Sequence, residues 1–146
     1  MTQLGKVLIA NRGAIATRII RTLQAMEVPS VAVYAVCDSG SLHVRIADES
    51  VCLNPEIPEQ NQPIHTYMNI NRILKIARET GAVAVHPGYG FLSENAEFVD
   101  RCEDHGLIFI GPTSEHIAMF GLKHKARALA MECNIPLLPG SQLLPN

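Results

Sequence analysis

Two glycines and several polar side chains gather in residues 86–95 (HPGYGFLSEN), directly after the apolar run at residues 82–85. Glycine tolerates positive φ and close approach of the backbone, so this composition suits a loop that shapes a ligand-facing edge of a sheet. The candidate residues of this loop for ligand or domain contacts are His86, Gly88, Tyr89, Gly90, Glu94 and Asn95. An ordinary turn between a strand and a helix is the alternative interpretation.

A second candidate is the break Asn11-Arg12-Gly13, which follows the apolar run at residues 6–10. It precedes a helical pattern, and a helix N-terminus has free backbone donors that could bind an anion. The dinucleotide fingerprint GxGxxG is absent because Gly13 stands alone, so we reject a nicotinamide or flavin enzyme. Alternatively, Gly13 only allows the helix to pack on the strand.

A third candidate is Lys123, at the start of the last helical pattern. The helix dipole favours anions at that end, and a lysine there can reach a phosphate oxygen as a mobile point charge. Lys125 and Arg127 are close by and could supply the same charge. A solvated surface lysine is the alternative, and the residues alone do not rank these cations.

These candidates depend on an alternation of strands and helices along the chain. Predicted strands cover residues 6–10, 31–34, 50–53, 82–85 and 107–110. Predicted helices cover residues 15–26, 43–47, 68–80, 96–105, 114–120 and 122–133, with loops at 37–42 and 54–62. The second predicted strand is apolar at both odd and even positions, which is typical of a strand that is buried on both faces of the sheet. We therefore predict an α/β fold with a doubly wound, mainly parallel, Rossmann-like sheet and helices on both faces.

Length and composition are those of one globular domain. The chain has 146 residues, of which 47% are hydrophobic and 18% charged, and its net charge is −2. Charges of both signs are interspersed, so we expect no nucleic-acid partner and no binding to an anionic membrane. The apolar runs are shorter than a membrane helix requires and the N-terminus lacks a signal-peptide pattern, so a cytoplasmic protein is expected.

No metal ligand and no catalytic residue is predicted within the chain. The four cysteines lack the two-residue spacing of a zinc or redox motif, and the six histidines show no HExxH pattern. The carboxylates do not converge into an acid–base pair, and no serine lies in a GxSxG motif. The residues alone therefore indicate an α/β domain whose glycine loops face an anionic ligand.

Several motifs along the chain resemble those of the biotin carboxylases. They are KVLIANRG at residues 6–13, RIIR at 18–21, LHV at 42–44, ADE at 47–49, HPGYGFLSEN at 86–95 and FIGP at 109–112. Together they resemble the N-terminal domain that precedes the ATP-grasp region of those enzymes, sometimes called the pre-ATP-grasp domain. GLKHKAR at residues 121–127, and Ala14 in GAIA, are similar to the urea carboxylase branch, which includes the urea amidolyases.

The resemblance implies ATP-dependent carboxylation of biotin by bicarbonate, followed by carboxyl transfer to urea to give allophanate. It implies ATP, magnesium or manganese, and biotin as cofactors of the full-length enzyme, with Lys123 contacting the nucleotide. The metal ligands and most of the ATP site are implied to lie downstream. Residues 1–140 correspond to the N-terminal domain, and residues 141–146 to the start of a linker to the ATP-grasp domain.

The implied partners are the downstream ATP-grasp and C-terminal biotin carboxylase domains, a biotin carboxyl carrier domain and a carboxyltransferase domain. Arg18 and Arg21 match dimer-interface positions of the family, which implies a homodimer, although Ala25 replaces an acidic residue seen in some members. The loop around Asp38 also departs from the family pattern, because a basic residue is lost there.

We expect the 146 residues alone to be inactive, because the resemblance places the catalytic residues downstream. One alternative is the same domain of an acyl-CoA, pyruvate or guanidine carboxylase, which differs only in the carboxyl acceptor. The other is a truncated, non-catalytic module that acts in assembly. Continuation of the reading frame past Asn146 into an ATP-grasp region would exclude the truncated module.

Overall fold

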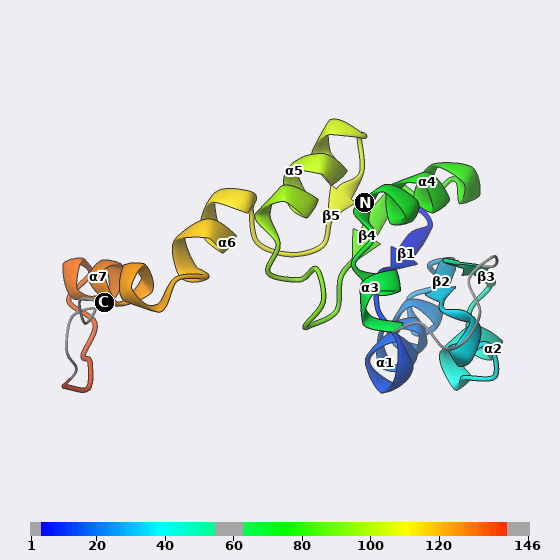
Figure 1. Ribbon diagram of the computed structural model, residues 1–146, viewed down its shortest axis with the longest axis horizontal. Helices are drawn as coiled ribbons and strands as arrows, with labels where there is room; N and C mark the ends of the chain where they lie inside the picture. The colour runs from blue at the N-terminus through cyan, green and yellow to red at the C-terminus, as the bar shows by residue number, and fades with distance from the viewer. Residues whose placement is uncertain (1–3, 55–62, 140–146) are drawn as a thin grey trace.

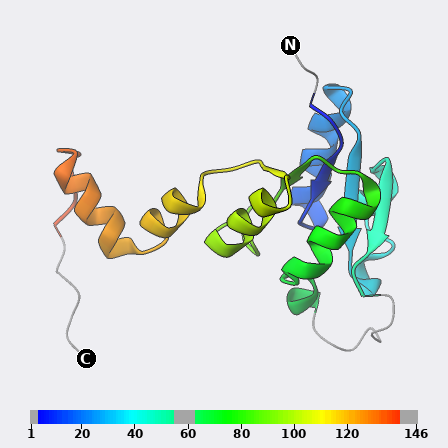
Figure 2. The ribbon, with the colours of Figure 1, turned by 90° about the horizontal axis from the view of Figure 1, so that it is seen from above.

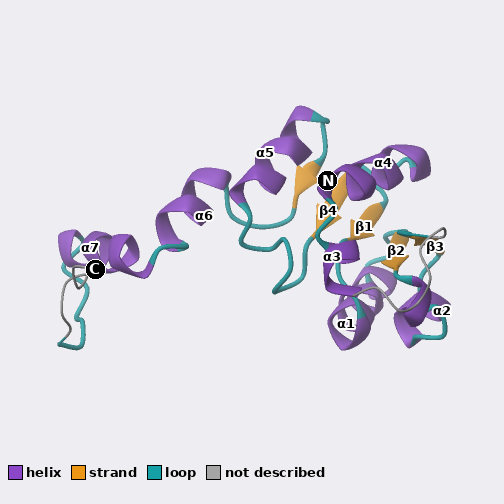
Figure 3. Ribbon diagram, viewed as in Figure 1, coloured by secondary structure: helices purple, strands orange, loops and turns teal. Residues whose placement is uncertain are grey.

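The computed structural model describes residues 4–54 and 63–139, which form an open α/β sheet with helices on both sides (Figure 1, Figure 3). The strands lie in the order β3-β2-β1-β4-β5, and every pairing between neighbours is parallel. Their bounds are β1 (Val7–Ile9), β2 (Ser30–Tyr34), β3 (Glu49–Cys52), β4 (Ala84–His86) and β5 (Ile108–Phe109). The predicted doubly wound parallel sheet is confirmed.

The helices alternate with these strands along the chain. They are α1 (Gly13–Ala25), α2 (Leu42–Ile46), α3 (Pro63–Tyr67), α4 (Ile70–Thr80), α5 (Ala96–Asp104), α6 (Ser114–Phe120) and α7 (Lys123–Glu132), with a 3-10 turn, η1, at Val36–Asp38. Val7 and Ile9 of β1 share one core with Ile20 of α1, whereas Leu8 lies in the opposite core with Phe98 of α5. Because both faces are covered, β1 is apolar at every position.

Polar caps and glycine set the ends of the helices. Asn69 accepts a hydrogen bond from Arg72 N at 3.0 Å at the start of α4, and Asn95 accepts one from Phe98 N at 2.8 Å at the start of α5. Gly81 ends α4 in the left-handed conformation, with a φ of 67°. Glycine at the end of α4 and asparagine at the start of α5 therefore set these two helix boundaries.

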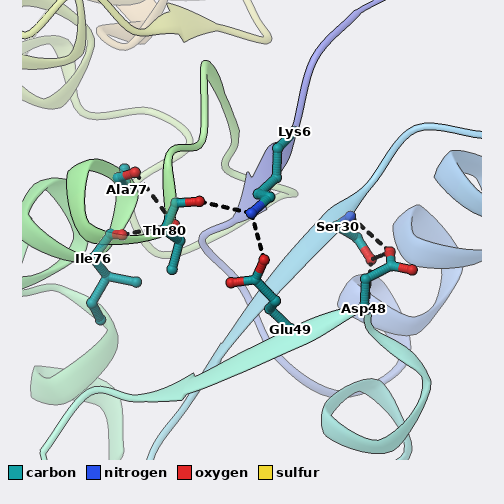
Figure 4. A network of polar contacts seen from close by, with 7 residues as sticks. All are labelled: Lys6, Ser30, Asp48, Glu49, Ile76, Ala77 and Thr80. Atoms are coloured by element: carbon teal, nitrogen blue, oxygen red, sulfur yellow. Dashed lines mark hydrogen bonds and ion pairs between the residues drawn. The ribbon is translucent and has the colours of Figure 1, made fainter.

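Polar contacts join the amino ends of three strands to the end of α4 (Figure 4). Lys6 Nζ donates to Glu49 Oε1 and also to Thr80 O, the second bond at 2.8 Å. Asp48 Oδ2 accepts hydrogen bonds from Ser30 N at 2.8 Å and from Ser30 Oγ at 2.7 Å. These contacts hold the amino edge of the sheet, whereas the candidate loops leave from the opposite, carboxyl edge.

The C-terminal helices extend away from the sheet (Figure 1, Figure 2). α6 packs against α5 and α7 packs against α6, and α7 has no buried residue. Large apolar side chains are exposed along this extension: Phe120, Leu122, Met131, Ile135 and Leu138. Exposed apolar side chains on neighbouring helices suit a surface that contacts another protein or domain.

The element order agrees with the sequence prediction, and the differences concern short elements and boundaries. The predicted loop at 37–42 begins inside η1, and α3 lies in a stretch for which no helix was predicted. The predicted strands at 82–85 and 107–110 are displaced or shortened to β4 and β5, as strand ends commonly are. Residues 55–62 of the predicted loop and the predicted linker at 141–146 lie outside the described residues. Each described helix falls short of the length and apolarity that a membrane crossing requires.

Candidate functional site

The first two candidate stretches, residues 11–13 and 86–90, meet at the carboxyl edge of the sheet. β1 pairs with both β2 and β4, so the chain builds the sheet outward first on one side of β1 and then on the other. The edge between β1 and β4 is therefore the topological switch point, where open α/β sheets commonly bind ligands. The structure brings these two predicted stretches together there.

The side chain of Asn11 links the first stretch to the second. Its side chain is fully buried, and Nδ2 donates to Pro87 O at 2.7 Å and to Tyr89 O at 3.0 Å. Its Oδ1 accepts a hydrogen bond from Arg12 N at 2.9 Å. A buried amide that is satisfied in this way holds the loop after β4 against the loop after β1. Asn11 therefore bonds within the chain itself.

Gly88 is required at its position for two separate reasons. Its φ is +67°, and a Cβ added to it would lie 2.6 Å from Asn11 Nδ2 and 2.8 Å from Ile15 Cγ2. Gly90 also has a positive φ, +69°, but a Cβ there would meet no heavy atom within 4 Å. The close backbone approach expected in this loop is thus found at Gly88, and the atoms approached are those of Asn11 and Ile15.

Gly13 begins α1 with a φ of +59°, and a Cβ added to it would meet no heavy atom within 4 Å. The backbone conformation requires this glycine, so the interpretation that it only allows close packing of helix on strand is wrong. Arg12 is the N-cap residue but makes no side-chain capping hydrogen bond, and no acidic residue lies in the first turn. The start of α1 is therefore not capped by a carboxylate.

The Arg12 guanidinium pairs with the buried carboxylate of Asp38. Arg12 Nε donates to Asp38 Oδ2 at 2.7 Å, and Arg12 Nη2 donates to Oδ1. The hydroxyl of Tyr67 donates to Asp38 Oδ2 at 2.7 Å and accepts a hydrogen bond from Ala35 N at 3.0 Å. Two-point pairing of this kind is among the stronger polar interactions in proteins. The positive charge that Arg12 could offer an anion is thus paired inside the chain.

These contacts keep each partner in one protonation state at neutral pH. Burial raises the pKa of Asp38, but hydrogen bonds from Arg12 and Tyr67 outweigh it, so the pKa lies below the ordinary 3.8. The hydrogen bond to Asp38 raises the pKa of Arg12, and burial raises the pKa of the Tyr67 hydroxyl. The group is an ion pair with a neutral tyrosine, which suits a structural role better than proton transfer.

Tyr67 connects this ion pair to the loop after β4. Its ring centroid lies 5.3 Å from that of Phe91, with an angle of 31° between the ring planes. Phe91 has a φ of +45°, a conformation that is unfavourable for a residue with a side chain. We name Asn11, Arg12, Asp38, Tyr67 and Phe91 the switch-point cluster.

His43 of α2 is fully buried near Asp38 and Arg12. Neither ring nitrogen has a hydrogen-bond partner among the described residues. Burial lowers the pKa of the imidazole more than the nearby Asp38 carboxylate raises it, which favours the neutral ring. The roles of Asp38, His43 and Tyr67 were not predicted. A signal lay in the family motif LHV and in the Asp38 loop, but neither indicates a contact with residue 67.

The remaining loop residues divide between internal contacts and solvent. His86 Nδ1 accepts a hydrogen bond from the backbone N–H two residues on, and burial, followed by Arg18, lowers the pKa of this imidazole. Asn95 is occupied as the cap of α5. Tyr89 is 70% exposed and Glu94 is exposed. Tyr89 and Glu94 are therefore the candidate side chains of this loop that are accessible to a ligand or a domain.

Arg18 and Arg21 lie on the exposed side of α1, on an open groove of about 710 Å³. Ala25 of the same helix and Leu42 of α2 also line this groove. The two arginines that the family resemblance places at a dimer interface are thus accessible on one surface of the chain.

Lys123 is the first residue of α7 and is exposed, as is Lys125. Arg127 differs from both, because its guanidinium donates to Leu138 O at 2.8 Å. The helix that Lys123 begins, α7, extends away from the sheet, whose carboxyl edge carries the switch-point cluster (Figure 1, Figure 2). The described chain does not bring the predicted nucleotide contact and the predicted loop into one site.

The described side chains do not gather into a metal-binding group. Within residues 4–54 and 63–139, no group of three His, Cys, Asp or Glu side chains is placed to hold a metal ion. The four cysteines all lie in these ranges and are free thiols. The described side chains therefore do not fit a magnesium or manganese site.

The fold and the site first define a class: an open, parallel α/β domain whose switch point is filled by its own side chains. Comparison with known proteins then gives the family. The family model described as "Biotin carboxylase, N-terminal domain" matches residues 3–117, and the chain belongs to this family. The predicted resemblance to that domain is confirmed.

Relatives whose names give different activities are almost equally similar to this chain. Urea amidolyase of Lachancea kluyveri is 51% identical over 138 residues, which are 94% of this chain and 7% of that protein. Pyruvate carboxylase of Bacillus subtilis (strain 168) is 50% identical over 136 residues, 93% of this chain and 12% of that protein. The chain thus spans a small part of the length of these relatives.

A solved structure extends the comparison to bound molecules. It is the biotin carboxylase domain dimer of Hydrogenobacter thermophilus 2-oxoglutarate carboxylase in complex with MgADP, ADP and bicarbonate. It matches this chain with a TM-score of 0.87 and 40% sequence identity. The matched region covers 97% of this chain and 30% of the H. thermophilus chain.

Proposed function

We propose that this chain is the N-terminal domain of the biotin carboxylase part of a urea carboxylase-like ligase. In such an enzyme, ATP and bicarbonate carboxylate biotin, and the carboxyl group then passes to urea to give allophanate. The supporting observation is the 51% identity with L. kluyveri urea amidolyase over 94% of the chain. The GLKHKAR run at residues 121–127 supports the same branch.

The same domain of a pyruvate carboxylase is a second candidate, because the B. subtilis enzyme is 50% identical to this chain. Carboxylases of acyl-CoA or guanidine are related alternatives. All of them share the first half-reaction and differ in the acceptor. ATP hydrolysis by the full-length protein, measured with each acceptor in turn, separates these candidates.

We propose that residues 1–140 form the domain and dock onto downstream ATP-grasp and C-terminal biotin carboxylase domains. The exposed apolar side chains along α6 and α7 support such a contact. A carrier domain for biotin and a carboxyltransferase domain complete the proposed set of partners. Residues 1–146 alone should then show no bicarbonate-dependent ATP hydrolysis. Full turnover by this fragment would refute the proposal and favour a self-contained enzyme, and a native chain that ends here would favour an assembly module.

We propose ATP, magnesium or manganese, and biotin as cofactors of the full-length enzyme. Lys123, an exposed cation at the start of α7, supports a contact of this chain with the nucleotide phosphates. The described side chains do not fit the metal, so its ligands must come from elsewhere in the protein. The MgADP complex of the H. thermophilus domain supports the choice of nucleotide and metal.

Lys123 is tested by replacement with methionine, which keeps the aliphatic stem and removes the charge. Lys123→Met in the full-length enzyme should raise the apparent KM for ATP by about tenfold, since a lost charged contact costs about 1.5 kcal/mol or more. Lys125→Met is the matched control, because Lys125 is also exposed and lies on the same helix. Equal ATP kinetics in the two variants would leave Lys123 as a surface residue.

We further propose that Arg18 and Arg21 lie at a homodimer interface, and that Tyr89 and Glu94 face a ligand or the downstream domain. The exposure of all four side chains and the dimer form of the H. thermophilus domain support this proposal. Arg18→Glu combined with Arg21→Glu should shift the full-length protein to a smaller species in analytical ultracentrifugation. Arg78→Glu, on the exposed side of α4, is the control and should leave the sedimentation unchanged.

A further inference from the structure

We propose that Tyr67 is a positioning residue for the turn at residues 88–91, and that Asp38 and Arg12 act through Tyr67. The inference rests on the proposed function, in which this loop faces a ligand or the downstream domain. It adds to that function the set of contacting side chains that fixes the shape of the loop.

The turn needs support from outside because its backbone is unfavourable. Gly88 and Gly90 have φ values of +67° and +69°, and Phe91, which carries a side chain, has a φ of +45°. Such a conformation persists only where the surroundings enforce it. Asn11 binds the backbone on one side of the turn, and the Tyr67 ring contacts the Phe91 ring on the other.

The two supports are joined by one ion pair. The Tyr67 hydroxyl is fixed by Asp38 Oδ2 at 2.7 Å and by Ala35 N at 3.0 Å. Asp38 in turn accepts from Arg12 Nε at 2.7 Å, and Arg12 N donates to Asn11 Oδ1 at 2.9 Å. A closed series of contacts therefore runs from the turn through the switch-point cluster and back to the turn.

The ring of Tyr67 and its hydroxyl have different roles in this arrangement. The ring is fully buried and makes the contact with Phe91, whereas the hydroxyl fixes the position of the ring against Asp38. Tyr67→Leu removes both features, and Tyr67→Phe keeps the ring. Leu23→Ala is the control, because Leu23 of α1 is buried in the core on the opposite face of the sheet. It lowers global stability without a place in the switch-point cluster.

The test uses the full-length protein and two readouts. Hydrogen exchange of peptides that cover residues 86–95 reports opening of the loop, and biotin-stimulated, bicarbonate-dependent ATP hydrolysis reports its function. Exchange of this segment should be about tenfold faster in Tyr67→Leu. Loss of the aromatic pair and of the buried ring area should increase the population of the open loop by about that factor. Tyr67→Phe keeps the ring contact with Phe91 but loses the bond to Asp38, so its exchange rate should lie between those of Tyr67→Leu and wild type. Leu23→Ala should leave it near wild type, because a local opening does not follow global stability.

Biotin-stimulated hydrolysis should fall about tenfold or more in Tyr67→Leu, as expected for a misplaced loop. The KM for ATP should be unchanged, because Lys123 lies on the C-terminal extension. If the segment exchanges no faster in Tyr67→Leu than in Leu23→Ala, the positioning role is overturned. If it exchanges faster while activity is unchanged, the positioning role stands and the proposed ligand-facing role of the loop is refuted.

Discussion

Gly88→Ala should destabilise the chain considerably more than Gly90→Ala, although both glycines lie in one turn and have nearly equal φ values. At Gly90 the added methyl group meets no heavy atom within 4 Å, so the cost is that of the backbone conformation alone. For a residue with a side chain in the left-handed region, this cost is about 1–2 kcal/mol. The Gly90 variant thus measures the conformational cost by itself.

At Gly88 the same conformational cost is joined by a steric one. The new Cβ would lie 2.6 Å from Asn11 Nδ2 and 2.8 Å from Ile15 Cγ2, and Asn11 is held by two hydrogen bonds to the loop. Overpacking of this kind costs about 1–3 kcal/mol. The total is about 2–5 kcal/mol, which corresponds to a fall in Tm of roughly 4–20 °C for a chain of this size.

The assay is urea and thermal unfolding followed by far-UV circular dichroism, because the chain has no tryptophan. A double-mutant cycle with Asn11→Ala isolates the contact. Removal of the Asn11 side chain opens space for the methyl group, so the double variant should be more stable than the sum of the single effects predicts. Equal destabilisation by Gly88→Ala and Gly90→Ala, together with strict additivity, would refute this reasoning.

Three further predictions concern stability. Asn95→Ala should lower the free energy of unfolding by about 1 kcal/mol. Thr113→Ala should lower it by less, because the capping bond to Thr113 is 3.3 Å long and that to Asn95 is 2.8 Å. Denaturant unfolding that ranks the two variants in the reverse order would contradict this prediction. Phe98→Ala should cost about 3–5 kcal/mol, because the fully buried ring packs edge-on against a second aromatic ring, and a loss below 1 kcal/mol would be inconsistent with that packing. Folding lowers the pKa values of Asp38 and Asp48, so the stabilisation from these carboxylates is fully present well above pH 3.8 and is lost as the pH falls through their folded pKa values. The free energy of unfolding, measured between pH 7 and pH 2.5, should show this loss. Asp48→Asn should make the free energy of unfolding less dependent on pH in this range.

The sheet could be predicted from the sequence because its signals are local. Apolar runs of strand length alternate with helical periodicity, and glycine or a capping residue marks most boundaries, as Gly81 and Asn95 illustrate. The resemblance to biotin carboxylases added the family, which the comparisons confirm. The predicted positions of the strand ends were less accurate, because hydrogen bonding between strands, rather than local composition, decides where pairing stops.

The switch-point cluster could not be predicted in full because its contacts are distant in sequence. Asp38 and Tyr67 lie 29 residues apart, and Asn11 and Pro87 lie 76 apart. The sequence indicated glycine loops that face a ligand. It did not indicate that the Asn11 side chain binds the backbone of the loop after β4, nor that Arg12 is neutralised by Asp38.

The most direct test of the central proposal is acceptor-dependent ADP formation by the full-length protein in the presence of bicarbonate and Mg-ATP. Urea should stimulate ADP formation strongly, and avidin, which sequesters biotin, should abolish the stimulation. Pyruvate, acyl-CoA and guanidine, tested at matched concentrations, should give little or no stimulation. Stimulation by pyruvate with no response to urea would contradict the account.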